Sequence, residues 1–103
     1  MARYVLTRTA QKDIEAIWVY FAKRSGSFEV AERAISRLRD KIAMLAAYPL
    51  SARQCDFHPQ WRCAPIDSYL IYYRERNGKI QVTQVVHARR SQAKAWKAKR
   101  AGS

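Results

Sequence analysis

The sequence predicts an α+β fold: an N-terminal strand, then an antiparallel helix hairpin packed on a small antiparallel β-sheet meander, then a basic C-terminal tail. Two observations predict this fold. Apolar residues recur at helical spacing in the first half of the chain, while β-branched and aromatic residues fill short segments of the second half. The 103 residues, 49% of them hydrophobic, suit one domain with one core. We expect residues 1–103 to form that domain, with residues 88–103 as a basic extension.

The first expected elements are a short strand at residues 3–7 and a helix that follows it. The segment around Tyr4 and Leu6 is too short and too rich in β-forming residues for a helix. Thr9 is a candidate N-cap for the helix, which should end near Ser25 and Gly26. Four apolar residues fall on one stripe of this helix, at Ile14, Ile17, Trp18 and Phe21.

A second, longer helix is expected after a short Ser-Gly-Ser link. Ser27 can cap it, and Glu29 in the first turn favours the helix dipole. Pro49 should stop the helix after Tyr48, because a proline disfavours helical geometry in the residue before it. Its apolar residues repeat at spacings of three and four, at Ala31, Ile35, Leu38, Ile42 and Leu45. Two amphipathic helices with so short a link should form an antiparallel hairpin.

The second half of the chain predicts four strands, at residues 55–57, 61–66, 69–74 and 79–87. Asn77-Gly78 lies between the last two strands and is the dipeptide that a type I′ hairpin turn prefers. Residues 69–73 are almost wholly apolar, as expected for a strand buried on both faces. The last strand changes phase between Val82 and Val85, which predicts either a β-bulge or a second covered face there.

The charge balance narrows the possible partners. Lys and Arg number 20 against 8 Asp and Glu, a formal net charge of +12, so the chain should attract polyanions or acidic proteins and could touch nucleic acid non-specifically. No apolar run approaches the roughly 18 residues that span a bilayer, and the N-terminus does not resemble a signal peptide. These features predict a cytoplasmic protein without a membrane segment.

No cofactor or metal is expected. The two cysteines, Cys55 and Cys63, are interpreted as ordinary core or strand residues, because a reducing compartment argues against a disulfide. A zinc site built from both cysteines with His58 and His87 would lack the paired ligand spacing of recognisable zinc sites.

Several segments, in this order, resemble the ParE toxins of the RelE/ParE superfamily. They are Thr9-Ala10-x-x-Asp13-Ile14-x-x-Ile17-Trp18-x-Tyr20, Leu45-x-x-x-Pro49, Arg62, the run Tyr69-Leu70-Ile71-Tyr72-Tyr73-Arg74, and Ile80-x-Val82-x-x-Val85-Val86-His87-x-Arg89-Arg90. The resemblance implies the toxin of a type II toxin-antitoxin (plasmid stabilisation) system. Such a toxin poisons DNA gyrase, blocks replication, is not an enzyme, and is neutralised by a ParD-like antitoxin.

The RelE-like toxins, which cleave messenger RNA on the ribosome, are the alternative. Their chemistry needs a general base, a cation and a general acid, for which Arg62, His87 and Arg89 are the candidates here. In RelE-like nucleases an arginine commonly follows the tyrosine that opens the central strand, whereas here Leu70 follows Tyr69. No tyrosine follows His87. His87 itself is interpreted first as a structural histidine hydrogen-bonded to a neighbouring loop, with a catalytic or contact role as the alternative. A nucleic-acid-binding regulator is a third class, but no recognition helix is evident.

Two sets of residues are candidates for partner binding. Apolar side chains of the helix hairpin could either fill the core or form a rim for an amphipathic antitoxin helix. The rim candidates are Trp18, Phe21, Leu38 and Ile42. The basic tail could either be solvated or contact gyrase. The gyrase candidates are Arg89, Arg90, Trp96, Lys97, Lys99 and Arg100.

Overall fold

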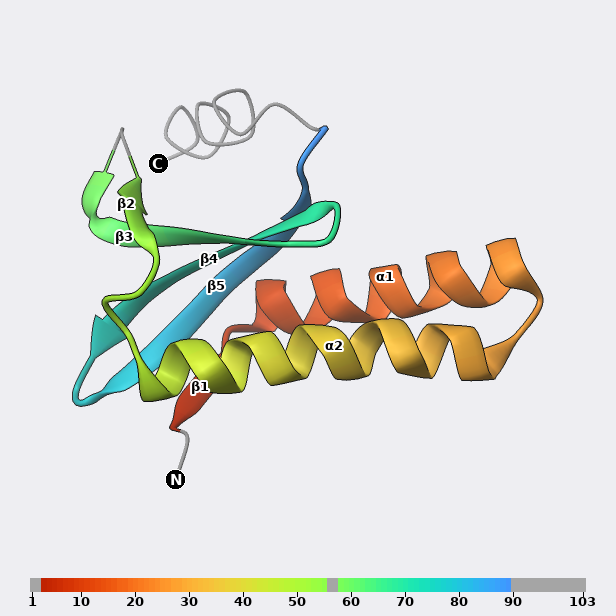
Figure 1. Ribbon diagram of the computed structural model, residues 1–103, viewed down its shortest axis with the longest axis horizontal. Helices are drawn as coiled ribbons and strands as arrows, with labels where there is room; N and C mark the ends of the chain where they lie inside the picture. The colour runs from red at the N-terminus through yellow and green to blue at the C-terminus, as the bar shows by residue number, and fades with distance from the viewer. Residues whose placement is uncertain (1–2, 56–57, 90–103) are drawn as a thin grey trace.

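The computed structural model describes residues 3–55 and 58–89 (Figure 1). Its elements are β1 (Tyr4–Leu6), α1 (Arg8–Ser25), α2 (Phe28–Ala47), β2 (Arg53–Cys55), β3 (His58–Ile66), β4 (Tyr69–Arg76) and β5 (Lys79–His87). The predicted order of strand, helix hairpin and antiparallel meander is confirmed. Within the described residues, no helix is long and apolar enough to cross a membrane.

The five strands form one sheet in the order β1-β5-β4-β3-β2. The meander from β2 to β5 is antiparallel, but β1 pairs in parallel with β5, from Tyr4 opposite Ile80 to Leu6 opposite Val82. The sheet is therefore mixed, and the N-terminal strand is part of it. Tyr4 and Leu6 pack against the core that the helices share with the sheet.

The first helix begins two residues earlier than the sequence suggested, so the assignment of Thr9 as N-cap is wrong. The Oγ1 atom of Thr7 accepts a hydrogen bond from the Ala10 N–H at 3.1 Å and donates one to the Thr83 carbonyl at 3.0 Å. The chain thus passes from β1 into α1 without a loop. This tertiary contact explains why the threonine nearer to the strand is the cap.

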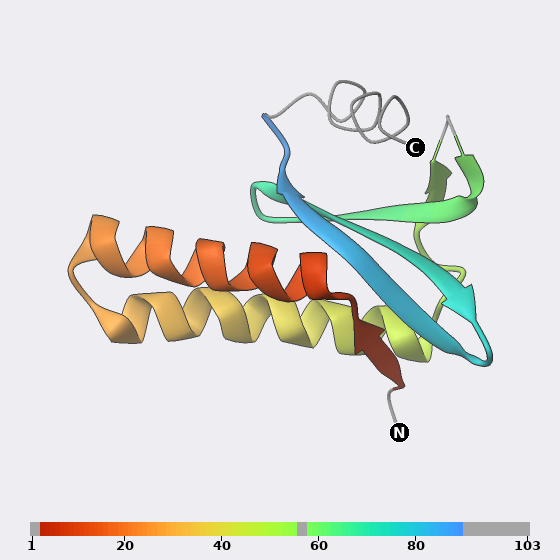
Figure 2. The same ribbon diagram turned by 180° about the vertical axis from the view of Figure 1, so that it is seen from behind.

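The second helix has the predicted ends. Gly26 ends α1 in the left-handed region at φ 70°, and the side chain of Ser27 caps α2. Tyr48, immediately before Pro49, is the C-cap of α2. The hairpin extends past the sheet, so that the end of α1 and the start of α2 stand clear of the strands in both views (Figures 1 and 2).

The central strand β4 is buried on both faces, as predicted. Ile71 and Tyr73 belong to the core beneath the helices, whereas Leu70 and Tyr72 pack on the opposite face. The cysteines, both buried, lie on that opposite face with Tyr72, as ordinary strand residues. The predicted bulge is also present: Tyr72 pairs with Gln84 and Tyr73 with Val82, which leaves Thr83 as the extra residue of β5.

Strand boundaries differ modestly from the prediction. β2 ends at Cys55, where a strand at 55–57 was expected; residues 56 and 57 lie outside the described residues. β3 begins at His58 rather than residue 61, since its first part pairs with β2. β4 continues to Arg76, up to the turn in which Asn77 and Gly78 have φ of 55° and 75°. These positive angles are those of the predicted type I′ turn.

Candidate protein-binding groove

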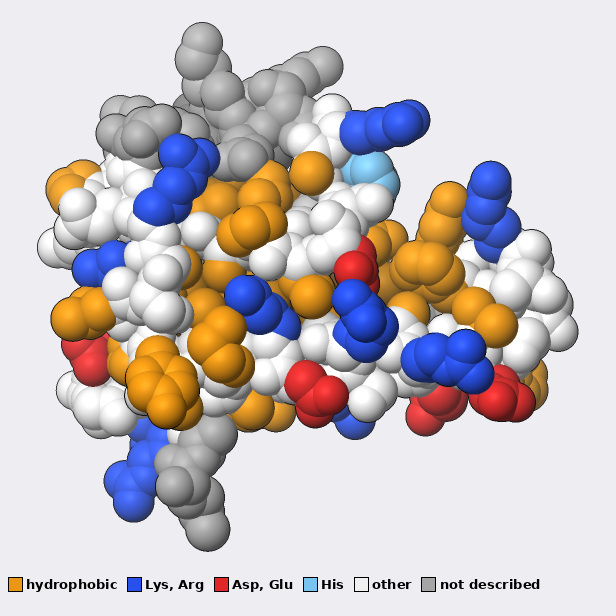
Figure 3. Space-filling view, in the orientation of Figure 1, with side chains coloured by type: hydrophobic (Ala, Val, Ile, Leu, Met, Phe, Trp, Pro, Cys, Tyr) orange, Lys and Arg blue, Asp and Glu red, His pale blue; other side chains and the backbone are white. Residues whose placement is uncertain are grey.

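A groove lies where the hairpin leaves the sheet. Figure 3 shows hydrophobic side chains gathered in the notch between the sheet and the projecting end of the hairpin. Two adjoining cavities of ≈ 230 and ≈ 330 Å³ make up the groove, and both are lined by Ile17, Tyr20, Tyr69 and His87. We call them together the hairpin groove.

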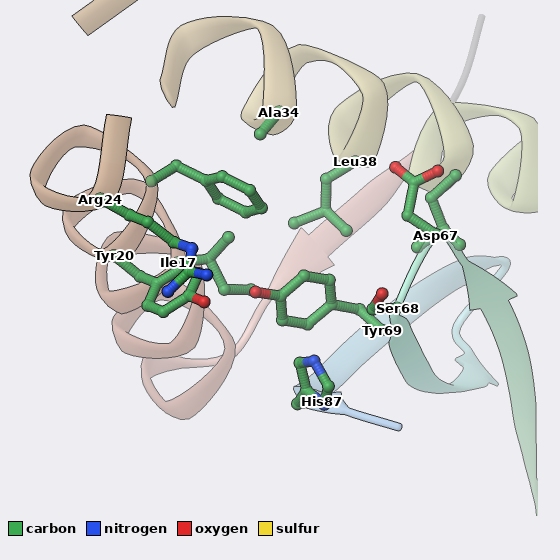
Figure 4. A pocket seen from close by; sticks show the side chains of 11 residues that line it. Ile17, Tyr20, Arg24, Ala34, Leu38, Asp67, Ser68, Tyr69 and His87 are labelled. Atoms are coloured by element: carbon green, nitrogen blue, oxygen red, sulfur yellow. The ribbon is translucent and has the colours of Figure 1, made fainter. Parts of the chain in front are cut away.

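Three parts of the fold build the walls of the hairpin groove (Figure 4). The α1 wall includes Ile17, Tyr20, Phe21 and Arg24; the α2 wall has Ala34 and Leu38; the third consists of the β3–β4 turn with the end of β5. Tyr69 reaches from the start of β4 toward Ile17, and His87 lies against it with ring centroids 5.3 Å apart in an edge-to-face arrangement.

Two carboxylates fix these walls. Asp13 Oδ2 accepts a hydrogen bond from the Val85 N–H at 2.9 Å, which ties α1 to β5. Asp67, in the β3–β4 turn, accepts two hydrogen bonds from Arg37, one from Nε at 3.0 Å and one from Nη2 at 2.8 Å. These bonds tie the turn to α2. These hydrogen bonds, together with the charge of Arg37, hold the pKa of Asp67 below its ordinary value.

The rim of the groove is basic. Arg24 and Arg89 line it, and the Arg24 guanidinium lies 5.9 Å from the centroid of the Tyr20 ring. The carboxylates of Asp13 and Asp67 already accept the hydrogen bonds described above. Arg24 and Arg89 are therefore available to acidic groups of a partner. An apolar floor with a cationic rim suits a segment that is apolar on one side and acidic on the other.

Of the four predicted rim residues, two line the hairpin groove and two do not. Phe21 and Leu38 line the groove, although Leu38 is only 3% exposed. Trp18 lies elsewhere, with its ring 5.4 Å from Phe28 and its Nε1–H donating to Glu32 at 2.6 Å. Ile42 is fully buried in the core, so its prediction as a rim contact is wrong: its stripe faces the sheet at that point of α2.

Sequence reasoning missed several residues of the groove. Tyr20 is 50% exposed, and Arg24 lies one turn further along α1. An aromatic residue beside an apolar helix stripe, rather than on it, was the available signal for Tyr20. The β3–β4 turn gave no signal, because its position depends on the tertiary fold.

The residues of the alternative nuclease site do not come together. Arg62 pairs with Tyr73 in the sheet, whereas His87 pairs with Tyr69, so the two are separated by four residues of β4, about 13 Å along a strand. Arg62 donates to the Ala52 carbonyl at 2.6 Å and so braces the connection after α2. His87 Nδ1 accepts from the Arg89 N–H at 3.1 Å, in keeping with a structural role at the strand end.

Among the described residues, burial raises the pKa of three side chains, those of Cys63, Tyr72 and Tyr73. Burial raises the pKa of the Cys63 thiol and that of the Tyr72 hydroxyl, so both groups stay protonated near neutral pH. Burial likewise raises the pKa of Tyr73, whose hydroxyl donates to the Pro49 carbonyl at 2.7 Å. In the described residues, no three His, Cys, Asp or Glu side chains gather as metal ligands.

Of the predicted gyrase contacts, only Arg89 is described, at the rim of the groove. Arg90, Trp96, Lys97, Lys99 and Arg100 lie outside the described residues.

Comparison with known proteins identifies the family. Residues 4–92 match the model of the ParE toxin of the type II toxin-antitoxin system parDE. Toxin ParE1 of Mycobacterium tuberculosis, in two strains, is 34% identical over 90 residues, which cover 85% of this chain and 91% of the relative.

Solved structures agree on the fold. The chromosomal ParDE system from P. aeruginosa superposes with a TM-score of 0.73 at 20% identity, covering 84% of this chain and 96% of that one. A conserved hypothetical protein from Helicobacter pylori gives a TM-score of 0.52 at 18% identity, covering 84% and 94%. By its sequence match over most of the chain, this protein belongs to the ParE toxin family of type II toxin-antitoxin systems.

Proposed function

We propose that this toxin acts in the cytoplasm by binding DNA gyrase, trapping it on cleaved DNA and blocking replication, and that a ParD-like antitoxin neutralises it. The observation that carries the antitoxin part of the proposal is the hairpin groove, which is apolar within and basic at the rim. Family membership supports the gyrase part, because the resemblance to ParE toxins implies that target.

An amphipathic segment of the antitoxin is the occupant that we propose for the hairpin groove. Its apolar side would cover Phe21, Leu38 and Tyr69, and its acidic side chains would meet Arg24 and Arg89. Because hydrogen bonds accepted by Asp13 and Asp67 hold the walls, the groove is largely formed before the partner arrives. Binding therefore costs little ordering of the toxin.

Action without catalysis is supported by the separation of Arg62 and His87, which pair with residues of β4 about 13 Å apart along that strand. General acid-base cleavage of RNA requires such groups within hydrogen-bond reach of one phosphodiester. On the target side we propose the basic tail, beginning at Arg89 and continuing with Arg90, Trp96, Lys97, Lys99 and Arg100.

Purified gyrase and supercoiled plasmid test the target. With the toxin added, we expect covalently trapped, cleaved plasmid, and we expect deletion of residues 92–103 to reduce this at least tenfold, about 1.4 kcal/mol of binding energy. The same truncated chain should keep its thermal stability and its affinity for the antitoxin, which is the control for folding.

A translating extract supplies the opposing result. Toxin that leaves gyrase unaffected yet shortens messenger RNA would overturn the proposal in favour of a ribosome-dependent nuclease. If the truncated chain still inhibits gyrase fully, only the proposal that the basic tail contacts gyrase is overturned.

A further inference from the structure

The charged side chains of the strands are almost all positive. Its five strands contain five Lys and Arg side chains but a single carboxylate, that of Glu75. The cations are Arg53, Arg62, Arg74, Arg76 and Lys79. In the helices, by contrast, acidic residues are interspersed, and an exposed pair of Arg33 with Glu29 bridges at 3.3 Å.

The cations of β4 and β5 gather at the end of the sheet that carries the β4–β5 turn. Two shallow depressions of ≈ 680 and ≈ 370 Å³ adjoin there, and both are lined by Arg76. Arg74 lines the larger depression and Lys79 the smaller one. We call this surface, defined by Arg74, Arg76 and Lys79, the basic end of the sheet.

The basic end is remote from the hairpin groove. Tyr69 lines the groove at the start of β4, whereas Arg76 is the last residue of the same strand. Seven residues of extended chain span about 23 Å. A ligand at one surface therefore leaves the other accessible.

One guanidinium of the basic end is held ready for an anion. Arg74 lies with its guanidinium carbon 4.9 Å from the centroid of the Trp61 ring, and its Nε donates to Gln81 Oε1 at 3.1 Å. The contact with Trp61 and the hydrogen bond fix the plane of the group at little further cost in entropy. The four N–H groups of its two terminal nitrogens form the fork that binds a phosphate with two parallel hydrogen bonds.

We propose that the basic end of the sheet binds the phosphate backbone of nucleic acid. Arg74 and Arg76 stand two residues apart on one strand, about 6.6 Å, a separation that lets each meet a different phosphate of the same backbone. Phosphate contacts of this kind position a protein without reading sequence. An acidic protein is the less suitable occupant, because stable protein interfaces are dominated by buried aromatic and apolar anchors and these three side chains offer charge instead.

The experiment must locate the contact, since a chain with a net charge of +12 binds DNA weakly at any surface. Binding of a fluorescent 20-base-pair DNA is measured from low to moderate salt for the full chain and two variants of equal charge. The test variant is Arg74→Gln/Arg76→Gln/Lys79→Gln. The matched control is Lys12→Gln/Lys23→Gln/Arg39→Gln, three exposed helix cations.

We expect the test variant to lose at least tenfold in affinity and the slope of log K against log salt to fall by about 2 to 3, one phosphate for each cation removed. The control should lose less than threefold. Because Arg74 is partly buried against Trp61, the double variant Arg76→Gln/Lys79→Gln is measured as well, and its slope should fall by about 1 to 2.

Equal losses in the test and control variants would overturn the proposal, since net charge alone would then account for binding. So would a test variant that binds DNA normally but loses affinity for poly-glutamate, a result that would assign the surface to an acidic protein. Neither measurement involves gyrase or an antitoxin, so its result is independent of the function proposed above.

Discussion

Two aspartates with different bonds hold the hairpin groove in shape. Asp13 accepts a hydrogen bond from a backbone N–H of β5, so it stabilises the groove only when that strand is in place. Asp67 bonds to Arg37 through both terminal oxygens while its own backbone is left-handed, at φ 52°. Asparagine tolerates that backbone conformation at least as well as aspartate does. Asp67→Asn therefore removes the charge without straining the turn.

At low pH the ion pair of Asp67 with Arg37 should leave a measurable signature. Because the pKa of Asp67 is lowered in the folded chain, its contribution is fully present above the ordinary value of 3.8 and is lost as the pH falls through the lowered value. In urea unfolding between pH 2 and 7, the free energies of unfolding of the parent and of Asp67→Asn should converge below the lowered pKa of Asp67. Both side chains are about half exposed, so the effect is small and weakens in salt.

The exposed pair of Arg33 with Glu29 provides the comparison for this measurement. Its contact is longer and single, so at pH 7 Glu29→Gln should lower the free energy of unfolding less than Asp67→Asn does. Curves for Asp67→Asn and the parent that run parallel from pH 2 to 7 would show that the ion pair does not stabilise the turn.

Among the elements, those with local signals were predictable from the sequence. Ser27 and Pro49 set the ends of α2 through contacts within a few residues, and Asn77-Gly78 set the turn before β5 through its own backbone preferences. The N-cap of α1 was not predictable, because Thr7 is selected by a bond to Thr83, 76 residues away. The parallel pairing of β1 with β5 is long-range for the same reason.

Paired substitutions test the corrected start of α1. Thr7→Ala removes the acceptor for the Ala10 N–H and the donor to the Thr83 carbonyl, so the free energy of unfolding should fall by about 1 to 2 kcal/mol. Thr9→Ala is the matched control. It changes an exposed position inside the helix and should alter stability by less than about 0.5 kcal/mol. Urea unfolding of both variants gives the two values, and equal losses would contradict the cap assignment.

For the whole molecule, the groove results from a mismatch in length between the hairpin and the sheet. The apolar stripes of α1 and α2 show which sides of the helices face inward, and this much the sequence predicted. The sequence could not show where the sheet ends beneath the two helices. Ile42 is fully buried in the core, whereas Phe21 and the edge of the core residue Leu38 also line the groove. Figure 1 shows the hairpin projecting past the sheet. The same topology puts the basic end of the sheet at the other end of β4.

Titration with the antitoxin encoded by the neighbouring reading frame tests the groove most directly. Ala34→Tyr fills the groove from α2, and Ser36→Tyr adds the same side chain at an exposed position of that helix outside the groove. If both variants unfold like the parent, we predict that Ala34→Tyr raises the Kd at least tenfold, about 1.4 kcal/mol, while Ser36→Tyr changes it less than threefold. A folded Ala34→Tyr toxin that binds the antitoxin as tightly as the parent would contradict the account.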